Sequence, residues 1–175
     1  MSEEIINKVA ESGIITIDLE EYYPREEITV FDIKPFLFRE LILKEKEFRE
    51  KLKTTDWEGY RDKYIALTNT ADAIIPMWAY MLIASYLQPV AKNIDFGSKE
   101  QVIQKMLVEK IQQIDENKYV GKRIVIKGCG DIVIPESAYV AVTNKLRPVV
   151  KSLMFGEPCS TVPVYKAAAA ISSIS

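Results

Sequence analysis

The sequence contains no histidine and two cysteines, and each shortage excludes a class of function. Without histidine, the chain cannot form the Ser-His or Cys-His pairs of common hydrolases, nor a zinc site with imidazole ligands. Two cysteines, Cys129 and Cys159, are too few for a disulfide-stabilised scaffold and are typical of a protein in a reducing cytoplasm. Any general base must therefore be a carboxylate, a lysine, a thiolate or a bound water.

The chain also lacks a charge excess and an uninterrupted apolar run. Its 175 residues include 23 of Lys and Arg against 25 of Asp and Glu, a balance that favours neither nucleic acid nor an anionic membrane as a partner. The first residues are acidic, unlike a secretion signal. The most apolar segment, residues 74–90, is interrupted by Pro76 and Pro89 and is too short to span a bilayer. We therefore expect a cytoplasmic protein that binds neither nucleic acid nor membrane.

What the sequence does contain is a repeated pattern. Tyr60 recurs as Tyr119, which is 119 − 60 = 59 positions later, and the alignment continues without a gap as far as Gly97 and Gly156. The two segments share 14 identical residues in 38 positions, whereas average composition would give about two or three. This similarity predicts an internal duplication, with copies at about residues 44–97 and 103–156.

Each copy predicts a helix, a buried strand, a loop, a second helix and a second strand. The strands are short apolar runs, and the second helix begins at Pro76 or Pro135, because the fixed φ of proline suits a first helical turn. Residues 36–38, beside the first charged helix, could instead form a short strand. The strands are expected at residues 64–67, 93–96, 123–126 and 152–155, and the charged helices at residues 44–53 and 99–114.

The residues before the repeat predict a short helix at 2–11 and two strands at 15–19 and 28–33, which we expect to pair as a β-hairpin. Since strand–helix–strand crossovers join parallel strands, the expected fold is α/β. It is a mixed, largely parallel sheet flanked by helices, built from the α-β-loop-α-β duplication behind the hairpin. Residues 1–166 are expected to form a single domain, and the low-complexity residues 167–175 a flexible tail.

Functional side chains are expected where parallel strands end, because ligands of open α/β sheets bind at that edge. One loop carries Cys129 between two glycines, and another carries Cys159. If the crossover between them is right-handed and parallel, both loops leave the same edge and the two thiols converge. They are then candidate ligands of a metal or an iron–sulfur cluster, or carriers of sulfur. Other candidate ligand-binding residues in these and the equivalent loops are Asp72, Asp131, Glu157, Ser160 and Thr161.

Two alternatives stay open for these residues. The cysteines can equally be small core residues, although Thr70 occupies the position of Cys129 in the first copy, so the fold does not require a thiol there. Asp72 and Asp131 occur in both copies, which favours a role in holding the loops through backbone N–H groups. Both also precede helix starts, where anionic ligands bind. These loops are therefore a candidate site for a small anion as well.

Known motifs assign no reaction to the chain. The glycines around Cys129 lack the third glycine of a dinucleotide fingerprint, no P-loop occurs, and no arginine closes a phosphatase-type loop after Cys159. This favours a non-enzymatic protein: either a thiol-based accessory protein or an interaction module. The surplus apolar face of Met77, Trp78 and Met81 is more polar in the second copy, and we expect it to form a homodimer contact.

Seven segments carry a resemblance to a known family: residues 14–19, 31–33, 41–46, 48–49, 72–76, 78–80 and 156–163. Together they resemble an uncharacterised bacterial domain-of-unknown-function family, family 2480, found mainly in Bacteroidetes. The resemblance covers nearly the whole chain apart from the tail. It implies no catalytic residue, because the family has no known activity. It does imply an association with iron–sulfur assembly genes, and hence iron–sulfur assembly proteins as partners.

Overall fold

The computed structural model describes residues 13–128, 130–157 and 159–168. They form two compact units. Unit 1 comprises Met1–Pro24 and Gln104–Ser175, and unit 2 comprises Arg25–Ile103. Unit 2 is therefore inserted in the sequence of unit 1, between its first and second strands.

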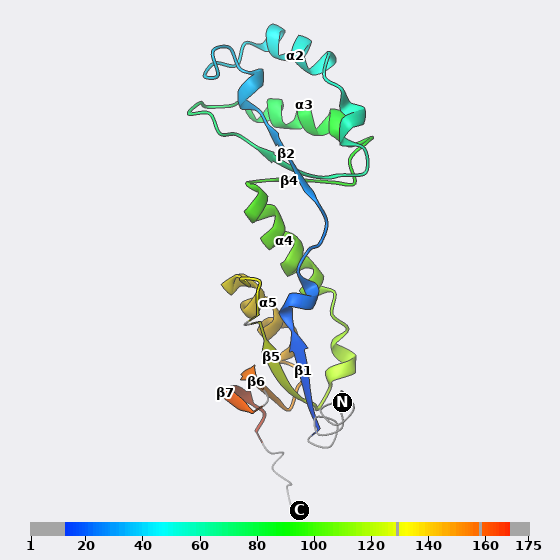
Figure 1. Ribbon diagram of the computed structural model, residues 1–175, viewed down its shortest axis with the longest axis vertical. Coiled ribbons are helices and arrows are strands. Elements are labelled where there is room, and N and C mark those ends of the chain that lie inside the picture. The colour runs from blue at the N-terminus through cyan, green and yellow to red at the C-terminus, as the bar shows by residue number, and fades with distance from the viewer. Residues whose placement is uncertain (1–12, 129, 158, 169–175) are drawn as a thin grey trace, which may run out of the picture. The chain divides into compact units, whose positions relative to one another are not determined.

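Unit 1 contains a four-stranded sheet in the order β1-β5-β6-β7 (Figure 1). The first three strands are parallel, and β7 runs antiparallel to β6. Buried Ile17, Ile124 and Leu153 from the strands pack with Ile111 and Val142 from the helices. The elements are β1 (Ile14–Asp18), the 3-10 helix η1 (Leu19–Tyr22), α4 (Lys99–Gln112), which begins in unit 2, η4 (Glu116–Tyr119), β5 (Arg123–Lys127), α5 (Glu136–Leu146), β6 (Ser152–Glu157) and β7 (Ser160–Lys166).

Unit 2 contains a three-stranded parallel sheet in the order β2-β3-β4. Both crossovers run in the same direction across the sheet, so right-handed connections place α2 and α3 on one face. Figure 1 shows both helices on the same side of β2 and β4. The elements are β2 (Ile28–Asp32), η2 (Lys34–Phe36), α2 (Glu45–Lys53), η3 (Trp57–Tyr60), β3 (Tyr64–Thr68), α3 (Met77–Leu87) and β4 (Asn93–Phe96).

The predicted α/β class and the largely parallel strand arrangement are confirmed, but the N-terminal β-hairpin is wrong. The two strands lie in different sheets: β1 pairs in parallel with β5, and β2 pairs in parallel with β3. The described residues thus form two sheets where we expected one. The hairpin was inferred from proximity in the sequence, whereas each strand gains a parallel partner from a distant segment and buries apolar side chains such as Ile17 and Phe31.

The strand β7 was also missed, because residues 156–163 were interpreted as a loop. Pro163 lies within this strand, and proline normally argues against a strand because it cannot donate a ladder hydrogen bond. Here it lies on the edge strand of the sheet, where the register with β6 shifts between Leu153 and Met154. An edge position at an irregularity tolerates proline. The other predicted strands and the helices after residue 43 occur within two residues of the expected bounds.

Equivalent elements of the two units start 59 residues apart, as the aligned sequences do: β3 and β5, α3 and α5, and η3 and η4. A shared origin by duplication and a single domain over residues 1–166 stay predictions. The predicted helix at 2–11 and most of the predicted tail lie outside the described residues. In the part of the chain that is described, none of the helices has the length and apolar character needed to cross a bilayer.

Candidate functional site

The carboxyl ends of three parallel strands in unit 1 are joined by one lysine. Lys127 ends β5, and its Nζ lies 3.4 Å from Glu157 Oε1 at the end of β6 and 3.9 Å from Asp18 Oδ2 at the end of β1. All three side chains are partly exposed, so each ion pair contributes little to stability. The lysine instead gathers two carboxylates at the edge where an open α/β sheet binds ligands.

The two glycines that flank position 129 are packed against the chain's own side chains. Gly128 is buried, and its carbonyl accepts a hydrogen bond of 3.1 Å from the Tyr139 hydroxyl. A Cβ at Gly128 would lie 2.5 Å from the Tyr139 oxygen, and one at Gly130 would lie 2.0 Å from Oε1 of Glu20. The close approach that the structure shows is by Tyr139 and Glu20.

Glu20 brings a buried carboxylate oxygen to this edge. Its Oε1 is shielded from solvent and has no hydrogen-bond partner among the described residues. The residue is the second of the short helix η1 after β1, where Asp18 Oδ1 accepts its backbone N–H at 3.0 Å. A shielded oxygen without a donor is costly unless it is protonated or meets a cation or a donor. Glu20 was not among the predicted site residues, because nothing in its local sequence distinguishes it from the other glutamates of the chain.

The strands β5 and β6 are parallel neighbours, so their carboxyl ends share one edge, as the thiol hypothesis requires. Cys159 follows β6 in the turn to β7 and is exposed. Cys129 lies outside the described residues, so the distance between the two sulfurs stays a prediction. No group of three or more acidic or thiol side chains suited to a metal occurs within residues 13–128, 130–157 and 159–168.

The other predicted site residues lie outside the ion pairs that Lys127 makes with Asp18 and Glu157. Asp72 and Asp131 are exposed, and they accept no hydrogen bond from the described residues. Ser160 is exposed at the start of β7, and its carbonyl oxygen would lie 2.5 Å from a Cβ at Gly156. The Thr161 hydroxyl donates a hydrogen bond to the Met154 sulfur at 3.7 Å, within the sheet. Anion binding at the loops of Asp72 and Asp131 stays a prediction.

In unit 2 the equivalent loop is held by a residue that sequence reasoning missed. Asp32 ends β2 as Asp18 ends β1, since both pair with the last residue of the central strand. Asp32 Oδ1 accepts the backbone N–H groups of Lys34 at 3.0 Å and Thr70 at 3.1 Å, and the Thr70 hydroxyl donates to Oδ2. Partial burial acts to raise the pKa of Asp32, but these hydrogen bonds outweigh it and lower the pKa. The sequence offered one signal for this role, because an aspartate stands at the end of both β1 and β2.

A second candidate site is an apolar groove in unit 2 between α3 and β4. Its volume is about 480 Å³, and Tyr80 and Ile94 contribute to its walls. The side chains of Met77 and Met81 are each 72% exposed beside it, and that of Phe96 is 68% exposed. Trp78, predicted to share this face, is instead half-buried against Phe48, with the rings 5.9 Å apart. The exposed face therefore consists of Met77, Met81 and Phe96, without the tryptophan.

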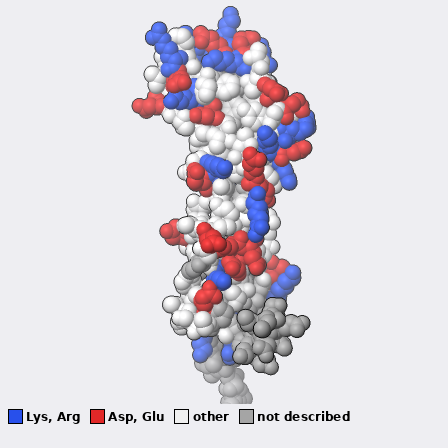
Figure 2. Space-filling view, in the orientation of Figure 1, with Lys and Arg blue, Asp and Glu red and all other residues white. Residues whose placement is uncertain are grey.

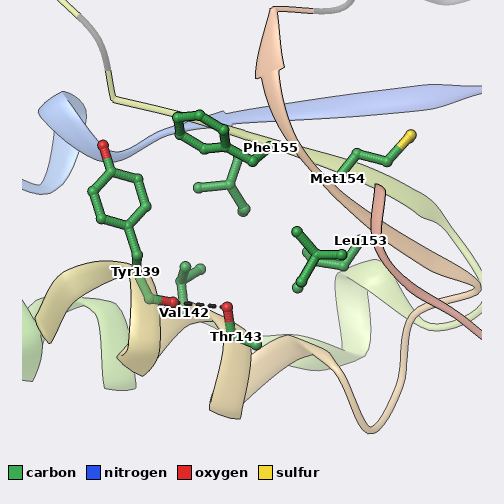
Figure 3. A pocket seen from close by; sticks show the side chains of 8 residues that line it. Tyr139, Val142, Thr143, Leu153, Met154 and Phe155 are labelled. Atoms are coloured by element: carbon green, nitrogen blue, oxygen red, sulfur yellow. Dashed lines mark hydrogen bonds between the residues drawn. The ribbon is translucent and has the colours of Figure 1, made fainter. Parts of the chain in front are cut away.

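Unit 1 contains the equivalent groove, but a strand lies beside it. Figure 3 shows Tyr139 and Thr143 of α5 facing Leu153 and Phe155 of β6, and the Thr143 hydroxyl donates to the Tyr139 carbonyl at 2.7 Å. The groove has a volume of about 330 Å³, and Val164 of β7 forms part of its wall. In unit 2 no described strand pairs with the outer edge of β4. Within the described ranges, the units therefore differ in that β7 pairs with β6 whereas no strand pairs with the outer edge of β4.

Charge does not distinguish either site. On the face shown in Figure 2, lysine and arginine side chains are interspersed with aspartate and glutamate over unit 2. The whole chain has a formal net charge of −2. Neither observation indicates a polyanionic partner, for which a basic face is the usual requirement.

The family model described as "Protein of unknown function (DUF2480)" matches residues 3–167. The chain belongs to the DUF2480 family. The match covers both units, so the family's fold includes the inserted unit 2 as well as unit 1. Neither a curated protein nor a solved structure matches this DUF2480 protein. The family therefore assigns it no reaction, ligand or partner, and its function has to be argued from the two sites above.

Proposed function

We propose that this protein is a non-enzymatic interaction module that forms a homodimer through the α3–β4 face of unit 2. One observation carries the proposal: Met77, Met81 and Phe96 are largely exposed around a groove whose equivalent in unit 1 lies beside β7. Large apolar side chains gathered at one place are typical of a protein interface. A two-fold dimer is the commonest assembly, and it requires a self-complementary patch, which an apolar face provides.

The first prediction concerns Met81. Replacing Met81 with lysine is expected to weaken the dimer by about a hundredfold to ten-thousandfold. A two-fold dimer buries this methionine once from each copy, and each burial contributes about 1.5–3 kcal/mol that a lysine forfeits. Multi-angle light scattering over a dilution series measures the change. The matched control is Val140→Lys, at the equivalent position of unit 1, where the side chain is also exposed. A wild-type protein that stays at 19.9 kDa at high concentration would contradict the proposal.

We propose as a second candidate a thiol-based accessory function at the carboxyl edge of unit 1. Cys129 and Cys159 would there bind a metal or an iron–sulfur cluster, or carry sulfur. Two observations support it: β5 and β6 bring both loops to one edge, and Glu20 holds a shielded, unpartnered oxygen beside Gly130. A partner protein or second copy would have to supply further ligands, since two thiols do not complete a cluster site. Iron–sulfur assembly proteins are the partners that the family resemblance suggests.

The second prediction tests this thiol function directly. Protein purified without oxygen is expected to carry iron or zinc, with acid-labile sulfide if a cluster is present. Replacing either cysteine with serine should lower the bound metal to background, because a thiolate is a far stronger ligand than a hydroxyl for these ions. Metal and sulfide analysis measure the result, and Thr70→Cys, which adds a thiol at the equivalent position of unit 2, serves as the control. A wild-type protein free of metal and inert to thiol reagents would exclude this candidate.

A cytoplasmic location in a bacterium accords with both candidates. The small number of cysteines supports it, because secreted proteins of this size commonly use disulfides. Fractionation of cells that express the tagged chain would test the location.

A further inference from the structure

The outer edge of β4 offers unpaired backbone groups in a defined pattern. The N–H groups of Asn93 and Gly97 donate to Lys63 and Leu67 on the β3 side, at 3.5 and 2.9 Å. Since alternate residues of a strand point their backbone groups in opposite directions, those of Ile94 and Phe96 point away from β3. Among the described residues, no strand pairs with these groups. Such an edge is a template for pairing with another strand.

Unit 1 shows what occupies the equivalent edge. Leu153 and Phe155 correspond to Ile94 and Phe96 at the 59-residue offset, and they pair with Tyr165 and Val162 of the antiparallel strand β7. Phe155 stacks edge-on against Tyr139 at 5.7 Å, as Phe96 does against Tyr80 at 5.3 Å. With β7 present Phe155 is 36% exposed, whereas Phe96 is 68% exposed. The same arrangement therefore occurs twice, once with an antiparallel strand and once without it.

We propose that the missing strand is β4 of a second copy, paired antiparallel across a two-fold axis with Ile94 opposite Ile94. This inference rests on the proposed homodimer and specifies how it forms. The pairing joins two three-stranded sheets into one continuous sheet. It also brings the apolar faces of both copies, each with its Met77, Met81 and Phe96, to the same side of that sheet.

The charges along β4 select this register. With Ile94 at the centre, Asn93 of each copy lies opposite Asp95 of the other copy. The dimer therefore contains two such pairs, each of an amide facing a carboxylate. The two side chains already form such a hydrogen bond within one strand, at 2.8 Å. A register centred on Asp95 would instead place two like charges directly opposite, which is destabilising. A slip towards Asp95 therefore loses both favourable pairs and gains a repulsion, and a slip the other way, centred on Asn93, also loses both pairs.

Two single-cysteine variants test the register. Both are made in the full chain with Cys129 and Cys159 replaced by serine; one carries Asn93→Cys and the other Asp95→Cys. After mixing, subunit exchange and oxidation by copper–phenanthroline, a disulfide joins the two variants only if residue 93 faces residue 95. Directly opposite residues meet the Cα separation that a disulfide requires, whereas residues displaced along the strand do not. Non-reducing electrophoresis measures the crosslinked fraction, and circular dichroism confirms that each variant is folded.

The mixture is expected to crosslink about tenfold more than either variant alone, because only the mixture places two thiols opposite each other. Crosslinking of Asp95→Cys alone would overturn the register, since it requires Asp95 opposite Asp95. A dimer in light scattering with no crosslink in any sample would overturn the strand pairing and leave the proposed homodimer standing. A monomer at all concentrations would overturn both.

Discussion

Replacing Phe31 with alanine is expected to lower the free energy of unfolding of unit 2 by about 3–5 kcal/mol. Phe31 is 2% exposed, and its ring contacts three others: Phe36 at 5.1 Å, Trp57 at 5.5 Å and Tyr60 at 5.6 Å. The loss therefore removes the central ring of an aromatic cluster and leaves a cavity. Domains of ordinary stability unfold with about 5–15 kcal/mol, so this one change can remove much of the stability of the unit.

Urea denaturation followed by tryptophan fluorescence measures this effect, because both tryptophans of the chain, Trp57 and Trp78, lie in unit 2. The control is Val30→Ala on the same strand, where the side chain is 46% exposed and the cost should stay below about 1 kcal/mol. A Phe31→Ala variant that unfolds at the urea concentration of the wild type would show that the aromatic cluster is not part of the stable core.

Replacing Asp32 with alanine is expected to cost about 1–2 kcal/mol, the range measured when a capping side chain is removed. The carboxylate accepts the N–H groups of Lys34 and Thr70 and the Thr70 hydroxyl, so its loss frees the loop after β3 from the end of β2. Adding Thr70→Val to the Asp32→Ala background should cost less than Thr70→Val alone, because the shared contact is already lost. Equal costs in the two backgrounds would show that the two residues are not coupled.

The contribution of Asp32 is also expected to depend on pH, and its lowered pKa sets the direction. Because the ionised form is favoured in the folded state, the stabilisation is fully present above the ordinary pKa of 3.8. It is lost as the pH falls below that value and through the lower pKa of the folded state. The difference in unfolding free energy between wild type and Asp32→Asn should therefore shrink towards acidic pH. A difference that stays constant between pH 7 and pH 2 would contradict the assignment.

Residues with a strong local signal were predicted correctly. Pro76 and Pro135 immediately precede the helices α3 and α5, and the apolar runs after Tyr60 and Tyr119 form buried strands. These signals succeed because proline geometry and burial periodicity act within a few residues of chain. The strand that contains Pro163 was missed because only the local sequence was used. Proline argues against a strand unless the strand is known to lie at the edge of a sheet.

The candidate sites were predictable only in part. Loops that follow neighbouring parallel strands lie at the same edge of a sheet. The positions of the loop before Asp131 and of Cys159 at one edge therefore followed from the order of the elements. The role of Lys127 in joining Asp18 to Glu157 did not follow from the sequence, because Asp18 lies 127 − 18 = 109 positions before Lys127 and pairs with it only through the β1–β5 ladder. The packing of Glu20 against Gly130 depends on the same long-range pairing.

Apart from β7, the order and kind of the main helices and strands within the described residues were thus inherent in the chain's local chemistry, and so was the exclusion of histidine-based catalysis. Which strands pair was decided by the folded molecule alone, because β1 finds β5 across an entire inserted unit and β7 adds to one sheet and not the other. Backbone ladders form between any strands that can bury their faces together, and sequence distance does not enter that energy. As a result, the two segments that are similar in sequence differ in their strand partners. The open edge that we propose as the interface belongs to unit 2.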